Sequence, residues 1–160
     1  MKAPPSAGAL DAARVISQQC LATRARRLER TVTRLYDAAL RHHGVSAAQL
    51  GVLVAVALTG DVQPKTLCTV LDLEKSTLSR NIALMVGRGW IESRREGRAQ
   101  RLRLTAAGSA VLVSALPAWR RAQSHAQRLL SRDAVEMLRQ VSGPAAAGPE
   151  SDTGHARRPT

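Results

Sequence analysis

Apolar residues recur at helical spacing along most of this chain. Between about Asp11 and His43 they lie three or four positions apart, which predicts one long helix packed against another helix. Its apolar seam consists of Leu21, Ala25, Leu28, Val32, Leu35 and Ala39. Gly44 ends this helix, and Ser46 is the expected cap of a second helix that runs to about Leu58. The side chains that the second helix is expected to bury are Leu50, Leu53, Val54 and Ala57.

The stretch from Gln63 to Thr105 has a different pattern, which predicts two short helices joined by a tight turn and followed by two short strands. Asp72 stands at the turn, where a left-handed backbone is needed and a short side chain that bonds locally is tolerated. Glu74 is the expected cap of the second of these helices. The buried sides are marked by Leu67, Val70 and Leu71 in the first helix and by Leu78, Ile82, Met85 and Val86 in the second.

The residues that follow predict a basic hairpin, because apolar and charged side chains alternate with a period of two. Its expected strands are Ile91 to Arg95 and Gln100 to Thr105, around a turn from Glu96 to Ala99. The hairpin carries Arg94, Arg95, Arg98, Arg101 and Arg103. Such a density of arginine gains little from burial and suggests an anionic partner; the alternative is a solvated hairpin that only aids solubility.

The last third of the chain predicts a long helix and a short one. Thr105 is the expected cap of the long helix, and Pro117 should kink or briefly break it. Ser131 or Asp133 starts the short helix. Residues 143–160 turn to Pro, Ala, Gly and charge, so we expect a disordered tail.

Together these elements predict a mainly α-helical fold with a small β-wing, in a single domain over residues 11–142. Residues 46–105 form its winged helix-turn-helix lobe, flanked by terminal helices at 11–43 and 106–142, and residues 1–10 are expected to be disordered. Because the terminal helices keep apolar seams, we expect them to pair two chains into a homodimer. The alternative is a monomer whose terminal helices pack only on each other.

Charge and composition limit the classes of partner and the cellular compartment that we expect. The formal net charge is +12 and the pI about 11.5, which indicates a nucleic acid or another acidic surface as partner. Aromatic residues are 2% of the chain and Phe is absent, which argues against an RNA-binding sheet that stacks bases on aromatic rings. Two cysteines fit a reducing compartment, and we see neither a signal-peptide core nor an apolar run of about eighteen residues. We therefore expect a cytoplasmic protein without a membrane segment.

The exposed side of the predicted second helix of the helix-turn-helix suits a DNA major groove. Its first turns are small and hydroxylic, so the helix can approach closely; Ser and Thr can bond base edges or phosphates, and Arg can pair with guanine. The expected DNA contacts on this helix are Lys75, Ser76, Thr77, Ser79 and Arg80. The expected contacts on the wing are its five arginines, with Arg98 at the tip that enters the minor groove. An ordinary surface helix with a solvated polar face is the alternative.

Five stretches of this chain resemble the MarR family of bacterial transcription regulators. The stretches are Arg34-Leu-Tyr-Asp37, Gly44-Val-Ser-Ala-Ala-Gln49, Leu71-Asp-Leu-Glu-Lys-Ser-Thr-Leu-Ser-Arg80, Gly87-Arg-Gly-Trp-Ile-Glu92 and Leu104-Thr-Ala-Ala-Gly108. The resemblance covers nearly everything between Cys20 and Ser142. It implies a homodimeric winged-helix protein that usually represses promoters and releases DNA when a ligand or an oxidant changes the dimer. Two features depart from the family: the short wing has Glu96-Gly97-Arg98 where members usually carry Asp-Arg-Arg, and Thr105-Ala-Ala-Gly lacks the usual Glu.

We therefore expect a sequence-specific regulator of transcription that binds double-stranded DNA as a homodimer on a palindrome, most often as a repressor. The alternative is a winged-helix module that docks protein or RNA without preferring one operator. The sequence shows no Gly-rich phosphate loop, nucleophile elbow or cluster of metal ligands, so we expect neither an enzyme nor a cofactor.

Two hypotheses address control. Cys20 is a candidate redox sensor, because Arg24 and Arg27 would share its helix face and stabilise a thiolate. The simpler interpretation, which we favour, is a small apolar residue at the dimer seam. A candidate pocket for a small aromatic or anionic effector would use Arg24, Arg27, Tyr36 and Trp119, although the two aromatic residues more commonly fill core space.

Overall fold

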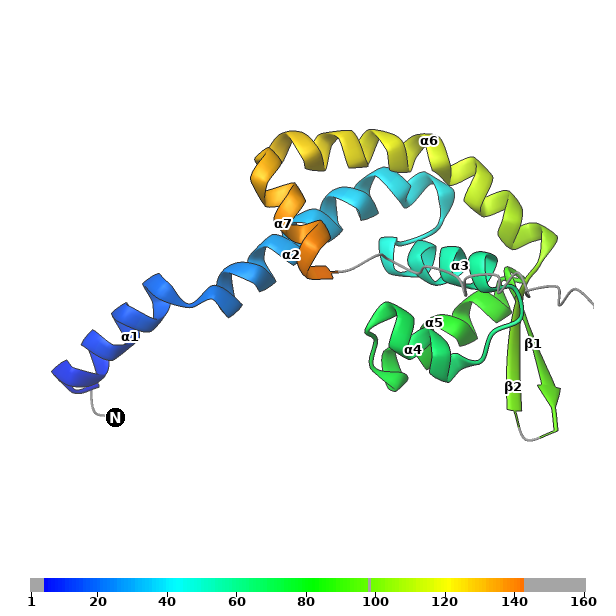
Figure 1. Cartoon of the computed structure of the whole chain (residues 1–160), viewed down its shortest axis with the longest axis horizontal. Helices are drawn as coiled ribbons and strands as arrows, with labels where there is room; N and C mark the ends of the chain where they lie inside the picture. The colour runs from blue at the N-terminus through cyan, green and yellow to red at the C-terminus, as the bar shows by residue number, and fades with distance from the viewer. Residues whose placement is uncertain (1–4, 98, 143–160) are drawn as a thin grey trace, which may run out of the picture.

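The computed structural model describes residues 5–97 and 99–142 of the chain (Figure 1). Its elements in chain order are α1 (Ala7–Gln19), α2 (Leu21–Leu40), the short 3-10 helix η1 (Arg41–His43), α3 (Ala47–Thr59), α4 (Pro64–Leu71), α5 (Lys75–Gly87), β1 (Ile91–Glu96), β2 (Ala99–Leu104), α6 (Ala106–Leu129) and α7 (Arg132–Ser142). The strands form one antiparallel two-stranded sheet. The predicted fold class, mainly α with a small β-wing, is confirmed. The expected disordered tail, residues 143–160, lies outside the described residues.

The predicted single helix from Asp11 to His43 is wrong, because the chain breaks at Cys20 into α1 and α2. Cys20 has an extended backbone with a ψ of 105°, and its N–H closes α1 by donating to the Ile16 carbonyl. The Arg24 guanidinium donates to the Gln18 carbonyl at 2.6 Å and so satisfies a free acceptor at the end of α1. Apolar periodicity could not report this break, since a helix end depends on local hydrogen bonds.

α1 makes almost no contact with the rest of the chain. It has no buried residue, and Figure 1 shows it extending away from the body together with the first turns of α2. It begins at Ala7, where the Ser6 hydroxyl accepts from the Ala9 N–H, so residues 7–10 are helical although we predicted disorder there. Ser6 therefore supplied a capping signal inside a segment that composition alone made look irregular.

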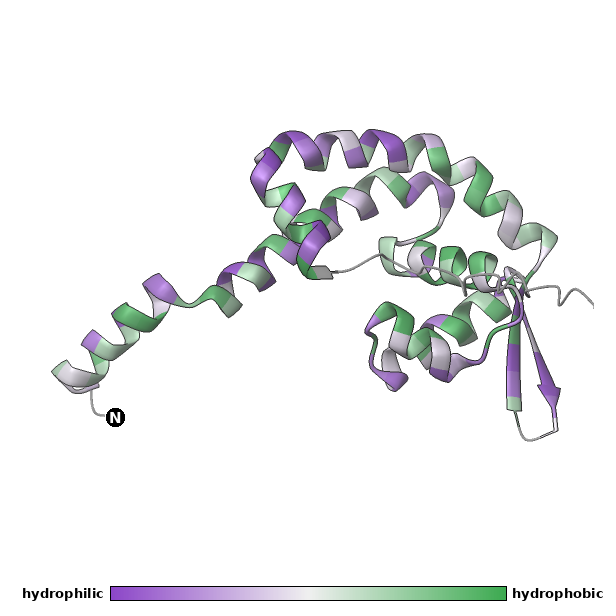
Figure 2. Ribbon diagram, viewed as in Figure 1, coloured by the Kyte–Doolittle hydropathy of each residue, from purple (hydrophilic) through white to green (hydrophobic). Residues whose placement is uncertain are grey.

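The core lies where α3, α4, α5 and the hairpin meet. Figure 2 shows α3 as a largely hydrophobic helix and the strands as largely hydrophilic. The largest fully buried side chains are Leu40, Leu53, Leu67, Leu78, Met85, Ile91, Leu102, Val52 and Val56. Val54 and Ala57, which we expected in this core, are exposed instead, and Val52 and Val56 take their places. α3 is apolar on nearly every side, so its sequence did not show which side faces inward.

The expected caps position the helices of the lobe. Ser46 accepts from the Gln49 N–H while the Gln49 side chain accepts from the Ser46 N–H, a reciprocal capping box at the start of α3. Pro64 opens α4, and Asp72 ends it with a φ of 48° in the left-handed region, as predicted. Glu74 precedes α5 as predicted, but its side chain makes no capping hydrogen bond.

The start of α6 is hydrogen-bonded to the backbone that follows α5. The Thr105 hydroxyl accepts from the Gly108 N–H at 3.0 Å and lies 2.6 Å from the Gly89 carbonyl oxygen. Gly108 is buried, and a Cβ there would lie 2.2 Å from the Trp90 carbonyl oxygen. The wing is therefore held at its base by a contact that only glycine permits.

α2 and α6 cross the top of the molecule side by side, as Figure 1 shows. α6 approaches closely because it buries small residues: Gly108, Ala115, Ala118, Ala122 and Ala126. The Tyr36 hydroxyl donates to the Gln123 side-chain oxygen across this seam. Pro117 does not interrupt α6, which curves along its length instead of breaking.

Among the described residues, no single helix has both the length and the apolar character needed to cross a membrane. The bent pair Leu21–His43 and Ala47–Thr59, with 76° between its parts, meets that requirement by length and composition only.

A candidate nucleic-acid interface

α4 and α5 form the predicted helix-turn-helix. Leu78, Ile82 and Met85 fasten α5 to the core. The opposite face is exposed and carries four of the five residues that we predicted to contact DNA, namely Lys75, Ser76, Ser79 and Arg80. This face is small except for its two cations, so its shape allows close approach to a partner.

The fifth predicted residue, Thr77, is only half-exposed, and its carbonyl accepts from the Asn81 side chain. Arg80 bends back along α5, with Nε 3.3 Å from the Ser76 carbonyl oxygen. No ion pair among the described residues involves Arg80, so its guanidinium remains available to an anion.

Two carboxylates lie beside the start of α5, and the sequence analysis considered their backbone roles but not their charge. Asp72 and Glu74 are both exposed, and neither forms an ion pair among the described residues. Their negative charge opposes the attraction of a helix N-terminus for phosphate. The start of α5 is thus a weaker phosphate site than its sequence suggested, and favourable contacts must come from Lys75 and Arg80.

The wing is better neutralised than its five arginines indicate. The strand register places Arg94 opposite Arg101, a pairing of like charges that is unfavourable by itself. Nearby acids offset it: Arg94 pairs with Glu92, Arg101 with Glu96 at 3.1 Å, and Arg103 with Asp61 at 3.9 Å. The Glu92 carboxylate also raises the pKa of the Arg94 guanidinium.

Arg95 therefore differs from Arg94, Arg101 and Arg103, which have acidic partners. It is exposed, it lies opposite Gln100 in the register, and none of the ion pairs among the described residues involves it. Arg98, our expected tip residue, lies outside the described residues. All of these salt bridges are at the surface, where water and salt screen them, so an incoming phosphate can compete with them.

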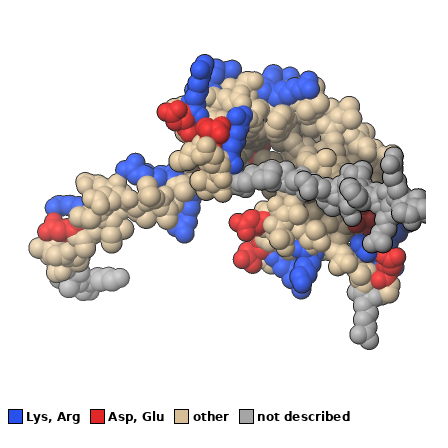
Figure 3. Space-filling model, viewed as in Figure 1, with Lys and Arg blue, Asp and Glu red and all other residues tan. Residues whose placement is uncertain are grey.

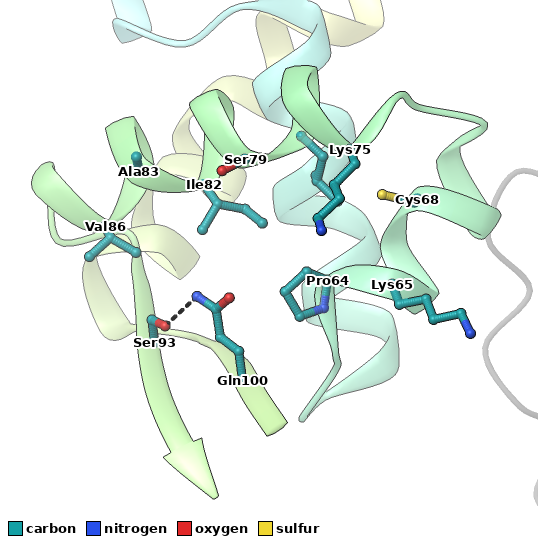
Figure 4. A pocket seen from close by; sticks show the side chains of 11 residues that line it. Pro64, Lys65, Cys68, Lys75, Ser79, Ile82, Ala83, Val86, Ser93 and Gln100 are labelled. Atoms are coloured by element: carbon teal, nitrogen blue, oxygen red, sulfur yellow. Dashed lines mark hydrogen bonds between the residues drawn. The ribbon is translucent and has the colours of Figure 1, made fainter. Parts of the chain in front are cut away.

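A cavity of about 640 Å³ separates the exposed face of α5 from the wing. Figure 4 shows Ile82 and Val86 of α5 on one side and Ser93 and Gln100 of the wing on the other. The Gln100 amide donates to the Ser93 hydroxyl at 2.8 Å. Lys75 and Ser79 belong to both the cavity and the predicted DNA face, which places the helix and the wing at one continuous surface.

Cys20 lies at the joint between α1 and α2, and its environment differs from the expected one. The Thr23 hydroxyl donates to its Sγ at 3.3 Å, and this hydrogen bond is the main reason that the pKa of the thiol is lowered. Arg26 contributes least, and the expected cations Arg24 and Arg27 do not contribute. Thr23 was missed because a threonine three residues later is an ordinary feature of a helix.

The four residues expected to line an effector pocket do not gather within one chain. Arg27 lies nine positions before Tyr36 on α2, roughly 14 Å along the helix, and Arg24 is farther away. Tyr36 packs against the core, where burial raises the pKa of its hydroxyl, and the Trp119 side chain remains 37% exposed. Gln123, the partner of Tyr36, was not predicted.

In the described part of the chain, no three His, Cys, Asp or Glu side chains gather closely enough to hold a metal ion.

Comparisons with known proteins show which proteins this chain is similar to. The sequence model of the MarR family matches residues 43–102, which run from the end of η1 to β2. The transcriptional regulator MosR of M. tuberculosis is 28% identical, with a TM-score of 0.67 over 78% of this chain and 96% of MosR. A cysteine-to-serine mutant of MarR from E. coli, solved in complex with operator DNA, is 21% identical, with a TM-score of 0.70 over 79% of this chain and 94% of MarR.

A probable transcriptional regulator from Pseudomonas aeruginosa is 23% identical, with a TM-score of 0.69 over 78% of this chain and 96% of that one. No curated protein sequence matches this chain. The likenesses under 25% identity concern the fold alone.

Proposed function

Because this chain belongs to the MarR family through its winged-helix domain, we propose that it regulates transcription by binding double-stranded DNA at specific sites. In this proposal α5 enters a major groove while the wing contacts the neighbouring minor groove. The protein acts as a homodimer on a palindromic operator, mainly as a repressor. It leaves the DNA when a small aromatic or anionic ligand binds or when an oxidant reacts.

One observation carries this proposal: the small, polar face of α5 and the arginine-bearing wing border the same cavity and so share one surface. Base edges can be read by Ser76, Ser79 and Arg80, while Lys75 and Arg95 supply charge for phosphates. The cysteine-to-serine mutant of E. coli MarR, which has this fold, was captured with operator DNA, and this supports the same use of the fold here.

A homodimer is supported by apolar side chains that the single chain leaves in water. They gather on α1, at the start of α2 and on α7, and comprise Leu10, Val15, Ile16, Leu21, Met137 and Val141. Val141 is 81% exposed and Leu21 is 79% exposed, although both stand on amphipathic helices. A second chain would cover these side chains and set two copies of α5 at a fixed spacing, which a palindrome matches.

The rival function is a winged-helix module that docks protein or structured RNA. Selection of bound fragments from the host genome, followed by fluorescence anisotropy, separates the two. A regulator should bind one palindrome far more tightly than random duplex, with an affinity that falls steeply as salt rises. Equal affinity for the selected and the random duplex would favour the rival.

Substitutions test the role of each surface. Arg80→Ala should reduce discrimination between the palindrome and single-base variants by about 1–3 kcal/mol, because a base contact is lost. Arg95→Gln should weaken binding to all duplexes alike and make the salt dependence shallower. Arg120→Ala, which removes the same charge from α6, is the control and should leave discrimination intact. Equal loss on specific and random DNA from Arg80→Ala would contradict our assignment of α5.

A further inference from the structure

The turn between η1 and α3 is held at both ends by side chains from other elements. At the start of α3, the Ala47 N–H donates to the Asp37 carboxylate of α2 at 2.7 Å. At the end of η1, the Gly44 carbonyl accepts from the guanidinium of Arg88, the residue that follows α5. One short turn therefore links α2, the rear part of a long flanking helix, to the end of the helix that carries the proposed base contacts.

Arg88 is well placed to hold the end of α5. Its backbone caps the helix, where its N–H donates to the Leu84 carbonyl at 3.0 Å. Its guanidinium carbon lies 4.8 Å from the centre of the Trp90 ring, a cation–π arrangement. No ion pair among the described residues involves Arg88, so the Gly44 carbonyl and the Trp90 ring define where its guanidinium lies.

The position of Arg88 does not suit a direct contact with DNA. It is exposed, but it follows the end of α5 that is farthest from the proposed base contacts. Eight positions separate it from Arg80, which is about 12 Å along the helix axis. Figure 3 shows Lys and Arg side chains on the underside of the lobe, below α4 and α5. A role in holding α5 in place therefore fits Arg88 better than a role in binding phosphate.

The angle of α5 matters because two copies must fit one palindrome. α5 has 13 residues and is about 20 Å long. A rotation of about 10° around the end beside Arg88 would move the other end by roughly 3 Å, which is close to the rise of one base pair. The distance between the two copies of α5 determines which separation of half-sites they match. A contact that fixes this angle therefore also fixes the preferred separation.

From these observations we propose that Arg88 is a positioning residue, which holds α5 at one angle to α2 and thereby selects the spacing of the two half-sites. Asp37 holds the same turn from the side of α2. This inference rests on the proposed function, since it requires a homodimer on a palindrome.

The test is fluorescence anisotropy of the full chain on three duplexes: the selected palindrome, the same palindrome with one base pair inserted at its centre, and a single half-site. The parent should prefer the unaltered palindrome to the expanded one by about a hundredfold or more. Arg88→Ala should reduce that preference about tenfold, and it should leave the half-site affinity and the salt dependence unchanged. Arg88→Lys keeps a donor for the Gly44 carbonyl and should keep most of the preference. Arg41→Ala removes an exposed charge from η1 and is the control, which should behave as the parent does.

A second pair of variants tests the contact from α2. Asp37→Ala removes the acceptor of the Ala47 N–H, so it should relax the spacing preference as Arg88→Ala does. Asp37→Asn keeps an acceptor oxygen at that place and should retain the preference. A loss of folding would lower the affinity for the half-site as well, whereas a change in the angle of α5 affects only the comparison between the two palindromes.

A measurement without DNA separates failure of this inference from failure of the proposed function. A spin label is placed at Ser79→Cys on α5, in a Cys20→Ser/Cys68→Ser background, and dipolar electron spin resonance measures the distance between the two copies. The distribution of distances should broaden in Arg88→Ala and not in Arg41→Ala.

Each outcome has a separate meaning. A parent that gives no distance between labels, or that binds both palindromes equally, would overturn the proposed homodimer on a palindrome and this inference with it. An Arg88→Ala protein that keeps the parent's spacing preference or the parent's distribution of distances would overturn this inference alone. An Arg88→Ala protein that loses affinity equally on the palindrome and the half-site, with a shallower salt dependence, would also overturn it, because Arg88 would then contact phosphate.

Discussion

At the scale of single residues, the pKa of the Cys20 thiol is lowered mainly by one neighbour, Thr23. The Thr23 hydroxyl stabilises the thiolate by donating a hydrogen bond at 3.3 Å, and the joint between α1 and α2 leaves the sulfur partly exposed. A lowered pKa increases the thiolate fraction near neutral pH, and the thiolate is the form that reacts with oxidants. The redox role of Cys20 stays a prediction, with Thr23 in the place that we expected the arginines to take.

Removing the Thr23 hydroxyl should slow the reaction of the Cys20 thiol with an alkylating reagent. In a Cys68→Ser background, where Cys20 is the single thiol, Thr23→Val should raise the pKa of Cys20 and reduce its rate of alkylation by iodoacetamide a few-fold near pH 7. The rate difference should vanish above the thiol pKa, where both proteins are fully deprotonated. Thr23→Ser keeps a hydroxyl and is the control. An unchanged pH profile in Thr23→Val would show that the hydrogen bond has no effect.

At the scale of elements, the junction between α5, the wing and α6 sets where the wing stands. Thr105 joins the first turn of α6 to the Gly89 and Trp90 carbonyls, and Gly108 lets α6 lie directly against that backbone. Both residues act on the wing from outside it. A residue far from the expected DNA face can therefore alter its geometry.

Two glycine substitutions test this contact. Gly108→Ala places a Cβ 2.2 Å from the Trp90 carbonyl oxygen, so the backbone must move, and we expect a loss of about 1–3 kcal/mol in the free energy of unfolding. Gly51→Ala, inside α3, meets nothing within 4 Å and should be neutral or stabilise by up to about 1 kcal/mol. Urea denaturation followed by circular dichroism measures both. A Gly108→Ala protein as stable as Gly51→Ala would mean that α6 does not lie against Trp90 in solution.

At the scale of the whole molecule, exposed apolar side chains recur on α1, at the start of α2 and on α7, where Ile16, Leu21 and Val141 are among the most exposed. Others, such as Val113 on α6, lie outside that region. The cations Arg80 and Arg95, which form no ion pair among the described residues, lie on α5 and on the wing. This arrangement suits a molecule that meets a second copy through the first set of helices and an anion through α5 and the wing.

Disrupting the exposed apolar side chains of α1 and the start of α2 should dissociate the proposed dimer into monomers. Ile16 and Leu21 are 64% and 79% exposed, so changing both to Glu should not unfold the chain, but it would place charges in the proposed dimer contact. Light scattering coupled to gel filtration should then report a monomer. Val113→Glu, at a 73% exposed position on α6 outside that region, should leave the mass unchanged. A dimeric Ile16→Glu/Leu21→Glu protein would contradict this interface.

Much of the fold followed from local sequence. The caps at Ser46 and Thr105, the left-handed Asp72 and the two strands of the wing were predicted and observed, because each depends on neighbours a few residues away. The expected alternation of apolar and charged side chains holds only in β2, around the buried Leu102, because β1 is exposed from Ser93 onward. The DNA contacts at Lys75, Ser76, Ser79 and Arg80 remain predictions, although the structure places all four on one exposed face.

Other features depended on contacts between distant segments. The acids that neutralise the wing include Asp61, from a turn outside it, and Tyr36 meets a partner 87 positions away. The buried side of α3 was likewise undecided, since a helix apolar all round can face inward in several ways.

Local periodicity and charge count were enough to predict most of the helical segments, the positions of the helix-turn-helix and the wing, and a strongly basic chain. The break of the first long helix at Cys20, the arginines that are left without acids and the cavity between α5 and the wing became visible once the chain was folded. Ion pairing and cavity shape arise from side chains far apart in sequence, and their meeting depends on how whole helices pack.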